Sequence, residues 1–340
     1  MRRHARRAWW SAAAFLIAAQ PAAMAQSDTL YMSILNSRKH RLGSTENPVV
    51  GLFVSTDGGT TWGHQGWREY IRVFYSEAGN DGTIWSGCGN GVLRSTDQGR
   101  QWRITTDWRV TEVLKVKTDP RRPSRVFAAT AYGIIRSTDL GETWQKAGEP
   151  LAGRFTSDVC IDRTNGDRVL AASEHGIYRS ADGGRMWTLA GAKESGIRVI
   201  VQHLSLPRVF FAGTEERGIV FSRDGGRTWR YSNTGLNHRT VYSIAVDPAD
   251  SQRIFAGTHG GGVYRSDDGG KSWRQMAKGL TNPVVHALVV SRGNPGVVFA
   301  GTLNGGLYRS TDRGNTWTWT GQEDAQVWGL SLKSGEHRQP

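Results

Sequence analysis

The sequence predicts an all-β protein, a seven-bladed β-propeller with four strands in each blade. The motif Ser-x-Asp-x-Gly-x-x-Trp occurs seven times in the 340 residues, and consecutive copies stand 40 to 44 residues apart. Each interval contains four short apolar runs bounded by Gly, Pro, Asn or Asp, which is typical of strands. No part of the sequence after residue 25 shows the sustained 3.6-residue period of a helix. Four strands in a repeat of this length describe one propeller blade.

The sixth repeat shows the four predicted strands most clearly. Its apolar runs cover residues 241–246, 253–257 and 262–265, and a last run begins at Ser272. The runs are four to six residues long and rich in β-branched and aromatic residues, as strands are. The motif therefore falls at a tight turn between the third and the fourth strand of each blade.

The two ends of the chain predict how the ring closes. The first repeat has no opening strand, because residues 29–35 match the second strand of other repeats and residues 51–54 match the third. The missing strand lies at the other end, at about 327–332. Joining it to the three N-terminal strands leaves no unpaired edge in the ring. We expect one domain over residues 27–333, followed by a polar tail at 334–340.

Residues 1–25 read as an export signal. Four arginines between Arg2 and Arg7 precede an apolar run from Ala8 to Ala19, and Ala23-Met24-Ala25 forms a small-x-small cleavage site. The apolar run is too short for a stable membrane anchor. We expect an exported bacterial protein, periplasmic or secreted, with no transmembrane anchor. The sequence leaves its oligomeric state open.

The excess of basic residues is spread over the repeats. The formal net charge is +13, and four of these charges belong to the signal arginines. Five more are a repeated arginine directly before the motif serine: Arg94, Arg136, Arg179, Arg265 and Arg309. One charge per repeat indicates a regular surface or a structural pairing, unlike the one-sided patch that nucleic-acid binding favours. We expect no nucleic-acid partner, whereas an acidic polymer, a membrane surface or an acidic protein stays open.

The cysteines and the motif aspartates predict no metal or cofactor site. Cys88 and Cys160 fall at different positions of different repeats, so we expect no disulfide between them. No Cys/His spacing is typical of a zinc or haem site. The motif Asp and Ser side chains can bond the backbone of their own turn, the Gly can adopt positive φ, and the Trp can bury an apolar face. The predicted structural residues are Asp57, Trp62, Asp97, Trp102, Asp139, Trp144, Asp182, Trp187, Asp224, Trp229, Asp268, Trp273, Asp312 and Trp317.

The seven motifs match the Asp-box, also called the BNR repeat. The text around Tyr264-Arg265-Ser266-Asp267-Asp268 resembles the repeats of photosystem II assembly and stability factors, of two-propeller xyloglucan-cleaving glycosidases and, more distantly, of sialidases. The resemblance covers about residues 30–332 and implies the propeller fold. It implies little about function, because Asp-boxes in those families lie on the blade periphery, away from ligand sites.

Ligand sites of a propeller are expected on the face that carries the interblade connections and the loops between second and third strands, here named the loop face. An insertion at residues 36–48 on this face carries Arg38, Lys39, His40 and Arg41, and is either a contact loop or a tolerated insertion. The predicted channel rim is basic and aromatic, and could clamp an anionic or carbohydrate ligand or be an ordinary wet mouth. Overlaying the repeats places at equivalent rim positions Arg72, Leu114, Ser157, Ile197, Tyr242, His286 and Trp328, with Asp158, Arg198 and Arg239 adjacent.

Three functions are compatible with this sequence. The first is a non-catalytic propeller of the cell envelope, such as an assembly or stability factor, that binds a protein or a polysaccharide through its loop face. The second is a glycoside hydrolase, which needs two carboxyl groups across the scissile bond. The loop-face carboxylates nominate no such pair: Glu112, Asp158, Glu194, Glu215, Glu216, Glu323 and Asp324. The third is a sialidase, but Tyr70-Ile71-Arg72-Val73 lacks the proline of the signature that the resemblance implies. We expect the first function, with no catalytic residue.

Overall fold

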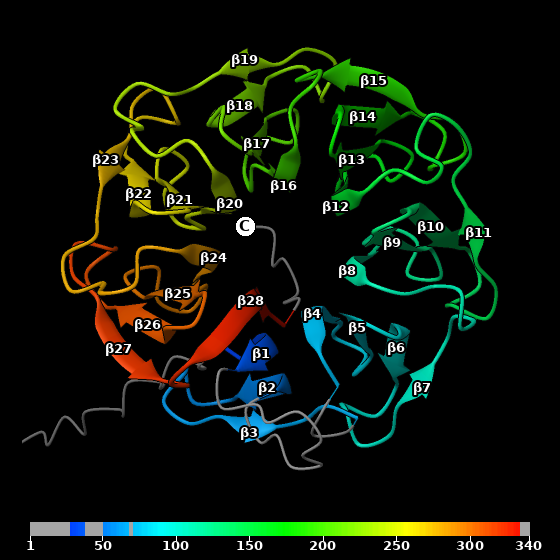
Figure 1. The fold of residues 1–340 in the computed structure, drawn as a ribbon, viewed down its shortest axis with the longest axis horizontal. Coiled ribbons are helices and arrows are strands. Elements are labelled where there is room, and N and C mark those ends of the chain that lie inside the picture. The colour runs from blue at the N-terminus through cyan, green and yellow to red at the C-terminus, as the bar shows by residue number, and fades with distance from the viewer. Residues whose placement is uncertain (1–27, 38–49, 68–70, 334–340) are drawn as a thin grey trace, which may run out of the picture.

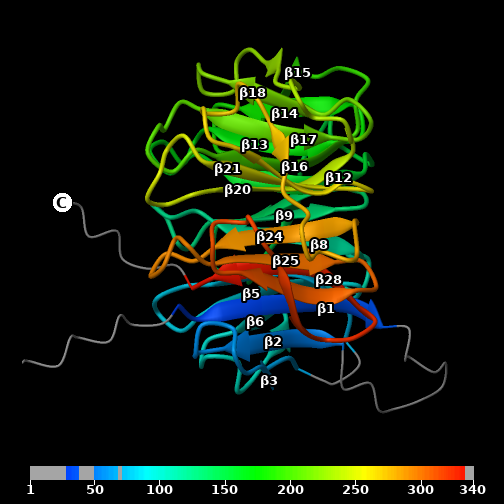
Figure 2. The same cartoon turned by 90° about the vertical axis from the view of Figure 1, so that its left-hand side faces the viewer.

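The computed structural model describes residues 28–37, 50–67 and 71–333, which form seven four-stranded antiparallel sheets around a central channel (Figure 1). The predicted seven-bladed propeller is therefore confirmed. The predicted signal segment, the tail at 334–340 and Arg38 to Arg41 lie outside the described residues. Seen from the side, the ring is a thick disc (Figure 2). In the described part of the chain, no helix is long and apolar enough to cross a membrane.

We number the blades in chain order. Within each blade, the strands are given from the innermost to the outermost. Blade 1 contains β28 (Ala325–Leu332), β1 (Leu30–Ser37), β2 (Gly51–Ser55) and β3 (Gly63–His64). Blade 2 contains β4 (Val73–Ala78), β5 (Ile84–Cys88), β6 (Gly91–Ser95) and β7 (Arg103–Ile104). Blade 3 contains β8 (Val113–Thr118), β9 (Val126–Thr130), β10 (Gly133–Ser137) and β11 (Gln145–Lys146). Blade 4 contains β12 (Thr156–Ile161), β13 (Val169–Ser173), β14 (Gly176–Ser180) and β15 (Thr188–Gly191).

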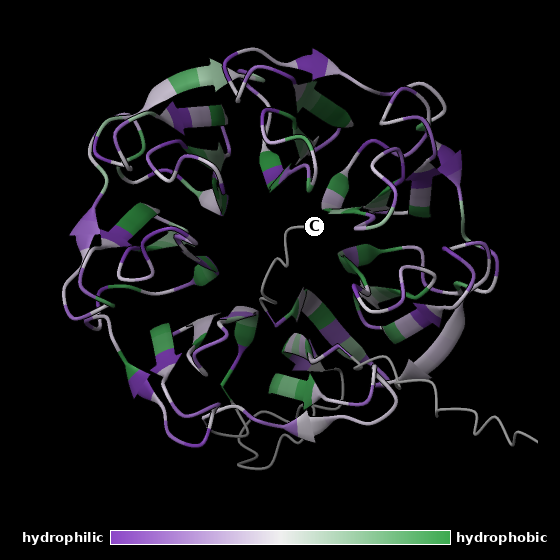
Figure 3. Ribbon diagram, turned by 180° about the vertical axis from the view of Figure 1, so that it is seen from behind, coloured by the Kyte–Doolittle hydropathy of each residue, from purple (hydrophilic) through white to green (hydrophobic). Residues whose placement is uncertain are grey.

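The remaining blades follow the same order. Blade 5 contains β16 (Ile197–Gln202), β17 (Phe210–Thr214), β18 (Ile219–Ser222) and β19 (Arg230–Tyr231). Blade 6 contains β20 (Val241–Val246), β21 (Ile254–Thr258), β22 (Gly262–Ser266) and β23 (Arg274–Gln275). Blade 7 contains β24 (Val285–Val290), β25 (Val298–Thr302), β26 (Gly306–Ser310) and β27 (Thr318–Gly321). The short outermost strands are exposed, and Figure 3 shows hydrophilic residues concentrated on several of them.

Blade 1 is built from both ends of the described chain. Strand β28 pairs antiparallel with β1, so that Leu30 lies opposite Leu332 and Met32 opposite Leu330. The strand begins at Ala325, two residues before the predicted start, and irregular pairing accommodates the extra residues near Ile34. The buried side chains of β1 and β28 share one hydrophobic cluster with those of blade 7. The ring therefore closes inside a blade rather than between two blades.

The Asp-box turn is held by its own side chains. In blade 3, the Ser137 hydroxyl donates to Asp139 Oδ1 at 2.7 Å and accepts from the Gly141 amide at 2.7 Å. Thr143 donates its amide to Asp139 Oδ1 at 2.9 Å and its hydroxyl to Oδ2 at 2.6 Å. These donors, that of Thr143 foremost, lower the pKa of Asp139 to about 2. The serine-to-aspartate bond is present in all seven turns.

The motif glycine lets each turn lie directly on the preceding blade. Gly184 in blade 4 has φ +84°, and a Cβ built there would stand 2.4 Å from the ring of Phe127 in blade 3. A Cβ built at Gly141 would likewise stand 2.8 Å from the ring of Trp85 in blade 2. Any side chain at these positions would be strained by its backbone and would push the blades apart. The glycine thus serves the contact between blades as well as the turn.

The repeated arginine before the motif serine joins neighbouring blades. Its guanidinium donates to the carbonyl that follows the motif aspartate of the next blade. Arg94 reaches the carbonyl of Leu140 at 2.9 Å, and Arg136 reaches that of Gly183 at 2.9 Å. The same contact recurs from Arg179 to Gly225 and from Arg265 to Arg313. Of the two meanings that the sequence allowed for this charge, the geometry supports the structural pairing.

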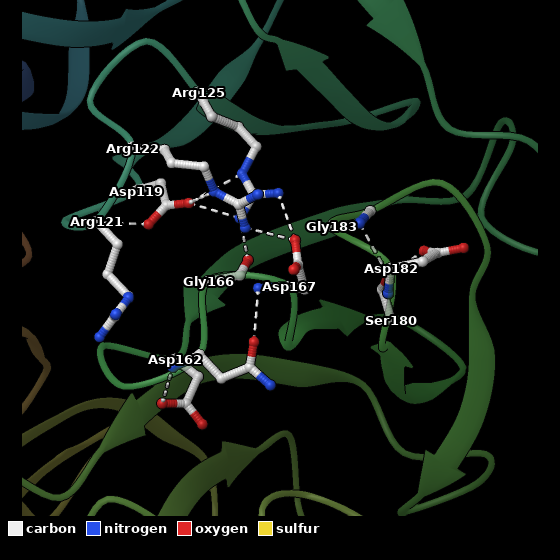
Figure 4. Close-up of polar contacts among 12 residues, drawn as sticks. Asp119, Arg121, Arg122, Arg125, Asp162, Gly166, Asp167, Ser180, Asp182 and Gly183 are labelled. Atoms are coloured by element: carbon white, nitrogen blue, oxygen red, sulfur yellow. Dashed lines mark hydrogen bonds and ion pairs between the residues drawn. The ribbon is translucent and has the colours of Figure 1, made fainter.

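A buried ion pair ties blade 3 to blade 4 on the Asp-box side of the ring (Figure 4). Arg125 donates through Nε to Asp119 Oδ2 at 2.9 Å, and Nη1 reaches Asp167 Oδ1 of blade 4 at 3.0 Å. Arg125 and Asp119 are both buried. Asp162 with Arg168 and Asp247 with Arg253 repeat the arrangement in blades 4 and 6. Charges buried this deeply are stable only while they remain paired.

We predict that a chain ending at Gly321 loses cooperative unfolding, because β1 loses its partner strand and Leu30, Met32 and Ile34 lose their cover. Each buried aliphatic side chain contributes about 1.5–3 kcal/mol. The measurement is thermal unfolding followed by circular dichroism. Adding a synthetic peptide of residues 322–333 should restore the cooperative transition, and a scrambled peptide should not. A native-like transition without the peptide would contradict closure by β28.

We also predict that Arg125→Met lowers the free energy of unfolding by about 3–5 kcal/mol, because it leaves the carboxylate of Asp119 buried without its partner. Arg121→Met is the matched control. It also removes one charge, but Arg121 is exposed and contacts Asp119 only through its backbone amide. The control should change the free energy by less than about 0.5 kcal/mol. Equal losses in urea denaturation of both variants would show that the pair is not the cause.

Candidate functional site

The central channel forms a cavity of about 1190 Å³ that is lined by the inner strands of all seven blades. In six of these strands the first residue is buried within the blade, and the second is more exposed and lines the channel. In β28 the corresponding residues are the third and the fourth, Val327 and Trp328. One position per blade therefore decides the chemistry of the loop-face mouth. In order from blade 1 to blade 7, that position holds Trp328, Phe74, Leu114, Ser157, Arg198, Tyr242 and His286.

Four of these side chains form a continuous aromatic arc, which we define as Phe74, Trp328, His286 and Tyr242. The ring centroids of Phe74 and Trp328 are 5.5 Å apart, and those of Trp328 and His286 are 4.8 Å apart. His286 and Tyr242 are 4.2 Å apart in a tilted arrangement. The arc runs over blades 2, 1, 7 and 6, so it depends on the closure of the ring by β28.

Arg198 of blade 5 extends the arc at the Tyr242 end. Its guanidinium carbon lies 6.0 Å from the Tyr242 ring and 5.6 Å from the Phe155 ring, both distances within cation–π range. Its Nη2 donates to Glu215 Oε2 at 2.6 Å. The mouth thus offers four neutral aromatic or imidazole side chains next to a cation that is already paired.

Three polar atoms in the channel wall are buried and have no hydrogen-bond partner within the described residues. They are the indole Nε1 of Trp328, the Nε of Arg198 and the hydroxyl of Ser243. Buried polar groups normally find a hydrogen-bond partner. Because these atoms are covered by the protein itself, the arc offers a ligand its ring surfaces rather than these donors.

Charged residues lie further along the channel, in blades 2 to 4. Lys117 donates to Glu77 at 2.6 Å and to the Tyr75 hydroxyl at 2.8 Å. The Lys115 ammonium lies 3.7 Å from the centroid of the Tyr75 ring and 3.9 Å from Asp158. These opposite charges are mutually compensated, so the cavity has an aromatic mouth and a neutralised polar interior.

Two carboxylates near the mouth, Asp158 and Glu215, are engaged with the protein itself. Asp158 is 3% exposed and accepts the amides of Val159 at 2.8 Å and of Ile200 at 3.0 Å. Glu215 is held by Arg198. Burial raises the pKa of the Cys160 thiol to about 12, so this channel residue is no nucleophile at neutral pH. The described residues contain no cluster of His, Cys, Asp or Glu that could hold a metal ion.

The predicted site residues fall into three groups. Asp158, Arg198, Tyr242, His286 and Trp328 line the cavity together. Arg72 and Arg239 are exposed and lie outside its lining, while Arg38, Lys39, His40 and Arg41 are outside the described residues. Whether any of them binds a ligand stays a prediction.

The predicted rim was wrong in two blades. The side chains equivalent to Tyr242 are Phe74 and Arg198, rather than Arg72 and Ile197, because β4 begins at Val73 and β16 begins at Ile197. Ile197 is fully buried in the blade. Four further channel residues were not predicted: Tyr75, Glu77, Lys115 and Lys117. Counting two and four residues from the buried start of each inner strand would have found them.

The comparisons with known proteins agree with this architecture. The BNR/Asp-box repeat family matches residues 264–275, and no curated protein matches the chain. A GH74 enzyme from Niastella koreensis superposes with a TM-score of 0.70 at 17% identity, covering 87% of this chain and 54% of the enzyme. An ancestral GH74 enzyme gives a TM-score of 0.62 at 18% identity, covering 77% of this chain and 38% of the enzyme.

A second kind of similar structure is a smaller protein. YCF48 bound to D1 peptide has a TM-score of 0.62 at 17% identity, with 84% of this chain and 90% of YCF48 covered. The chain thus spans about half the length of the Niastella enzyme and a smaller share of the ancestral enzyme. It spans nearly all of YCF48. At these identities the likeness concerns the fold. The chain is a seven-bladed Asp-box propeller, structurally similar to the GH74 enzymes and to YCF48.

Proposed function

We propose that this protein is a non-catalytic binding propeller that holds a segment of a partner protein at the loop-face mouth of its channel. The observation that carries the proposal is the aromatic arc of Phe74, Trp328, His286 and Tyr242, extended by Arg198. Aromatic rings give a large contact area at a small cost in conformational entropy, and Trp, Tyr and Arg dominate protein interfaces.

Two further observations support a protein partner over a polysaccharide substrate. Asp158 and Glu215 are engaged in contacts within the protein, and hydrolysis of a glycosidic bond needs one carboxyl group as acid and another as base or nucleophile. The similar YCF48 was solved with a peptide, and this chain covers 90% of that protein. The export signal expected at residues 1–25 leads us to propose that binding takes place in the periplasm or outside the cell.

The proposed site works with a neutral His286. Burial is the main cause that lowers the pKa of His286 to about 4, and the neighbouring His259 and Arg198 act in the same direction. At neutral pH the arc therefore contains an uncharged imidazole between Tyr242 and Trp328, which stacks without the cost of burying a charge.

We predict that Tyr242→Ala and Trp328→Ala each weaken partner binding about 10-fold or more, because central aromatic anchors carry most of an interface's energy. Trp319→Ala is the matched control, since Trp319 is 49% exposed on the outermost strand of blade 7. The measurement uses residues 26–340 on an array of peptides and of plant and bacterial polysaccharides. Bound protein and released reducing ends are read from the same wells.

The outcomes of the array separate the possible functions. Capture on peptides that falls in both arc variants, but not in the control, is the expected result. Release of reducing ends would overturn the non-catalytic function in favour of a glycoside hydrolase. Binding to a polysaccharide without release would replace the protein partner by a carbohydrate. Equal capture by all variants would remove the arc from the binding site.

We further predict that His286 makes the fold sensitive to acid. Its pKa is lower in the folded chain than in the unfolded one, so the unfolded chain takes up the proton first. The stability that this group contributes is complete above about pH 6.5 and is lost as the pH falls toward 4. Between about pH 7 and about pH 4.5, the urea midpoint should fall less in His286→Gln than in the wild type. His175, whose side chain is 44% exposed, supplies the control, His175→Gln, which should behave as the wild type does.

A further inference from the structure

The seam between blades 3 and 4 contains a second, smaller cavity far from the channel lining. It measures about 280 Å³ and is lined by Ile134, Arg136, Gln145, Lys146, Ala147, Gly184 and Arg185. Three of these side chains are cationic, and none is acidic. Among the described residues, no carboxylate forms an ion pair with Arg136, Lys146 or Arg185. The cavity is thus a concentration of positive charge without a counter-ion.

The seam between blades 2 and 3 shows how an acidic residue in the turn neutralises this charge. Arg94 of blade 2 occupies the place of Arg136, and Glu142 stands three residues after the motif aspartate of blade 3. Glu142 accepts from Arg103 at 3.1 Å and lies 3.6 Å from Arg94. In blade 4 the position of Glu142 is taken by Arg185. The residue at this one position of the repeat therefore decides whether the arginine charge at the seam is neutralised.

Other acidic groups nearby are already bound. Asp167 accepts from Arg125 and Arg122, and Asp182 Oδ1 accepts from Ser180 and from the amides of Arg185 and Met186 (Figure 4). The charge of Asp182 offsets only part of the field. Burial lowers the pKa of Arg136, and Arg185 and Arg125 add to that effect more than Asp182 opposes it.

The groups that line the cavity are suited to an oxyanion. Arg136 is fixed by bonds to the Gly183 carbonyl at 2.9 Å and to Gln145 at 2.8 Å, so its position costs little entropy on binding. Lys146 and Arg185 are exposed and add donors from the neighbouring strand and turn. The seam between blades 4 and 5 lacks the third cation, because Leu189 stands where Lys146 does.

We propose that the cavity between blades 3 and 4 binds a phosphate or sulfate group through Arg136, Lys146 and Arg185. Donors from two strands and a turn match the several acceptor oxygens of a tetrahedral oxyanion better than the two of a carboxylate. The group belongs either to a free ion or to an ester carried by a larger ligand. This site is independent of the aromatic arc, so its failure would leave the proposed function untouched.

The test is a ³¹P NMR titration of residues 26–340 with inorganic phosphate at low ionic strength, where screening is weak. Arg185→Glu should weaken phosphate binding at least about 10-fold, because it reproduces the compensated seam of Glu142. Arg100→Glu is the matched control. It makes the same change at the same turn position in blade 2, but the preceding blade has Val54 where blade 3 has Arg136. The control should stay within about twofold of the wild type.

A second variant and three competing ligands complete the test. Lys146→Ala, on an exposed strand, should also weaken phosphate binding and covers the case in which Arg185→Glu fails to fold. Sulfate should displace phosphate and acetate should not. Tighter binding of glucose 6-phosphate than of inorganic phosphate would identify an ester as the ligand, and the reverse order a free ion. The absence of saturable phosphate binding, equal losses in Arg185→Glu and Arg100→Glu, or displacement by acetate would each overturn the proposal.

Discussion

The contact between one blade's Asp-box turn and the strands of the preceding blade is the constraint on which the rest of this structure depends. A blade buries its apolar faces only against its neighbours, so seven separate sheets are stable only as a ring. The motif glycine permits the turn to touch an aromatic ring such as Phe127, and the arginine of the preceding blade then bonds the turn's carbonyl. The repeated polar motif is thus a device for joining blades, while the aspartate keeps the turn in shape.

Closure of the ring brings the side chains of the aromatic arc together at the channel mouth. Because β28 completes blade 1, Trp328 from the end of the described chain comes to lie between Phe74 and His286. The scaffold repeats, but the second residue of each inner strand is free to vary, since it faces the channel instead of a neighbouring blade. Four aromatic or imidazole side chains gather on one side of the mouth, and the charged side chains lie in blades 2 to 4.

The seams show the same division between scaffold and variation. Four of the arginines before a motif serine make the carbonyl contact, but their charges are balanced differently. Glu142 balances Arg94, and Asp267 balances Arg265 at 3.0 Å. Arg136 and Arg179 have Arg185 and Arg227 as neighbours instead. An arginine whose charge is not paired can be recognised here, because the equivalent arginines of the other repeats show what a paired charge looks like.

The fold, the blade count and the closure by the C-terminal strand could be predicted from the sequence, since these follow from local periodicity and from turn chemistry that recurs seven times. The shared place of Tyr242, His286 and Trp328 at the channel mouth could be predicted too. Arg72 and Ile197 were placed there wrongly, because β4 begins at Val73 and β16 begins at Ile197, so that Arg72 lies exposed before its strand and Ile197 is buried in the blade. The tertiary structure was needed to show which side chains stack, which carboxylates are already bound and which seams lack a counter-charge, because each of these depends on atoms that different repeats bring together across a blade boundary.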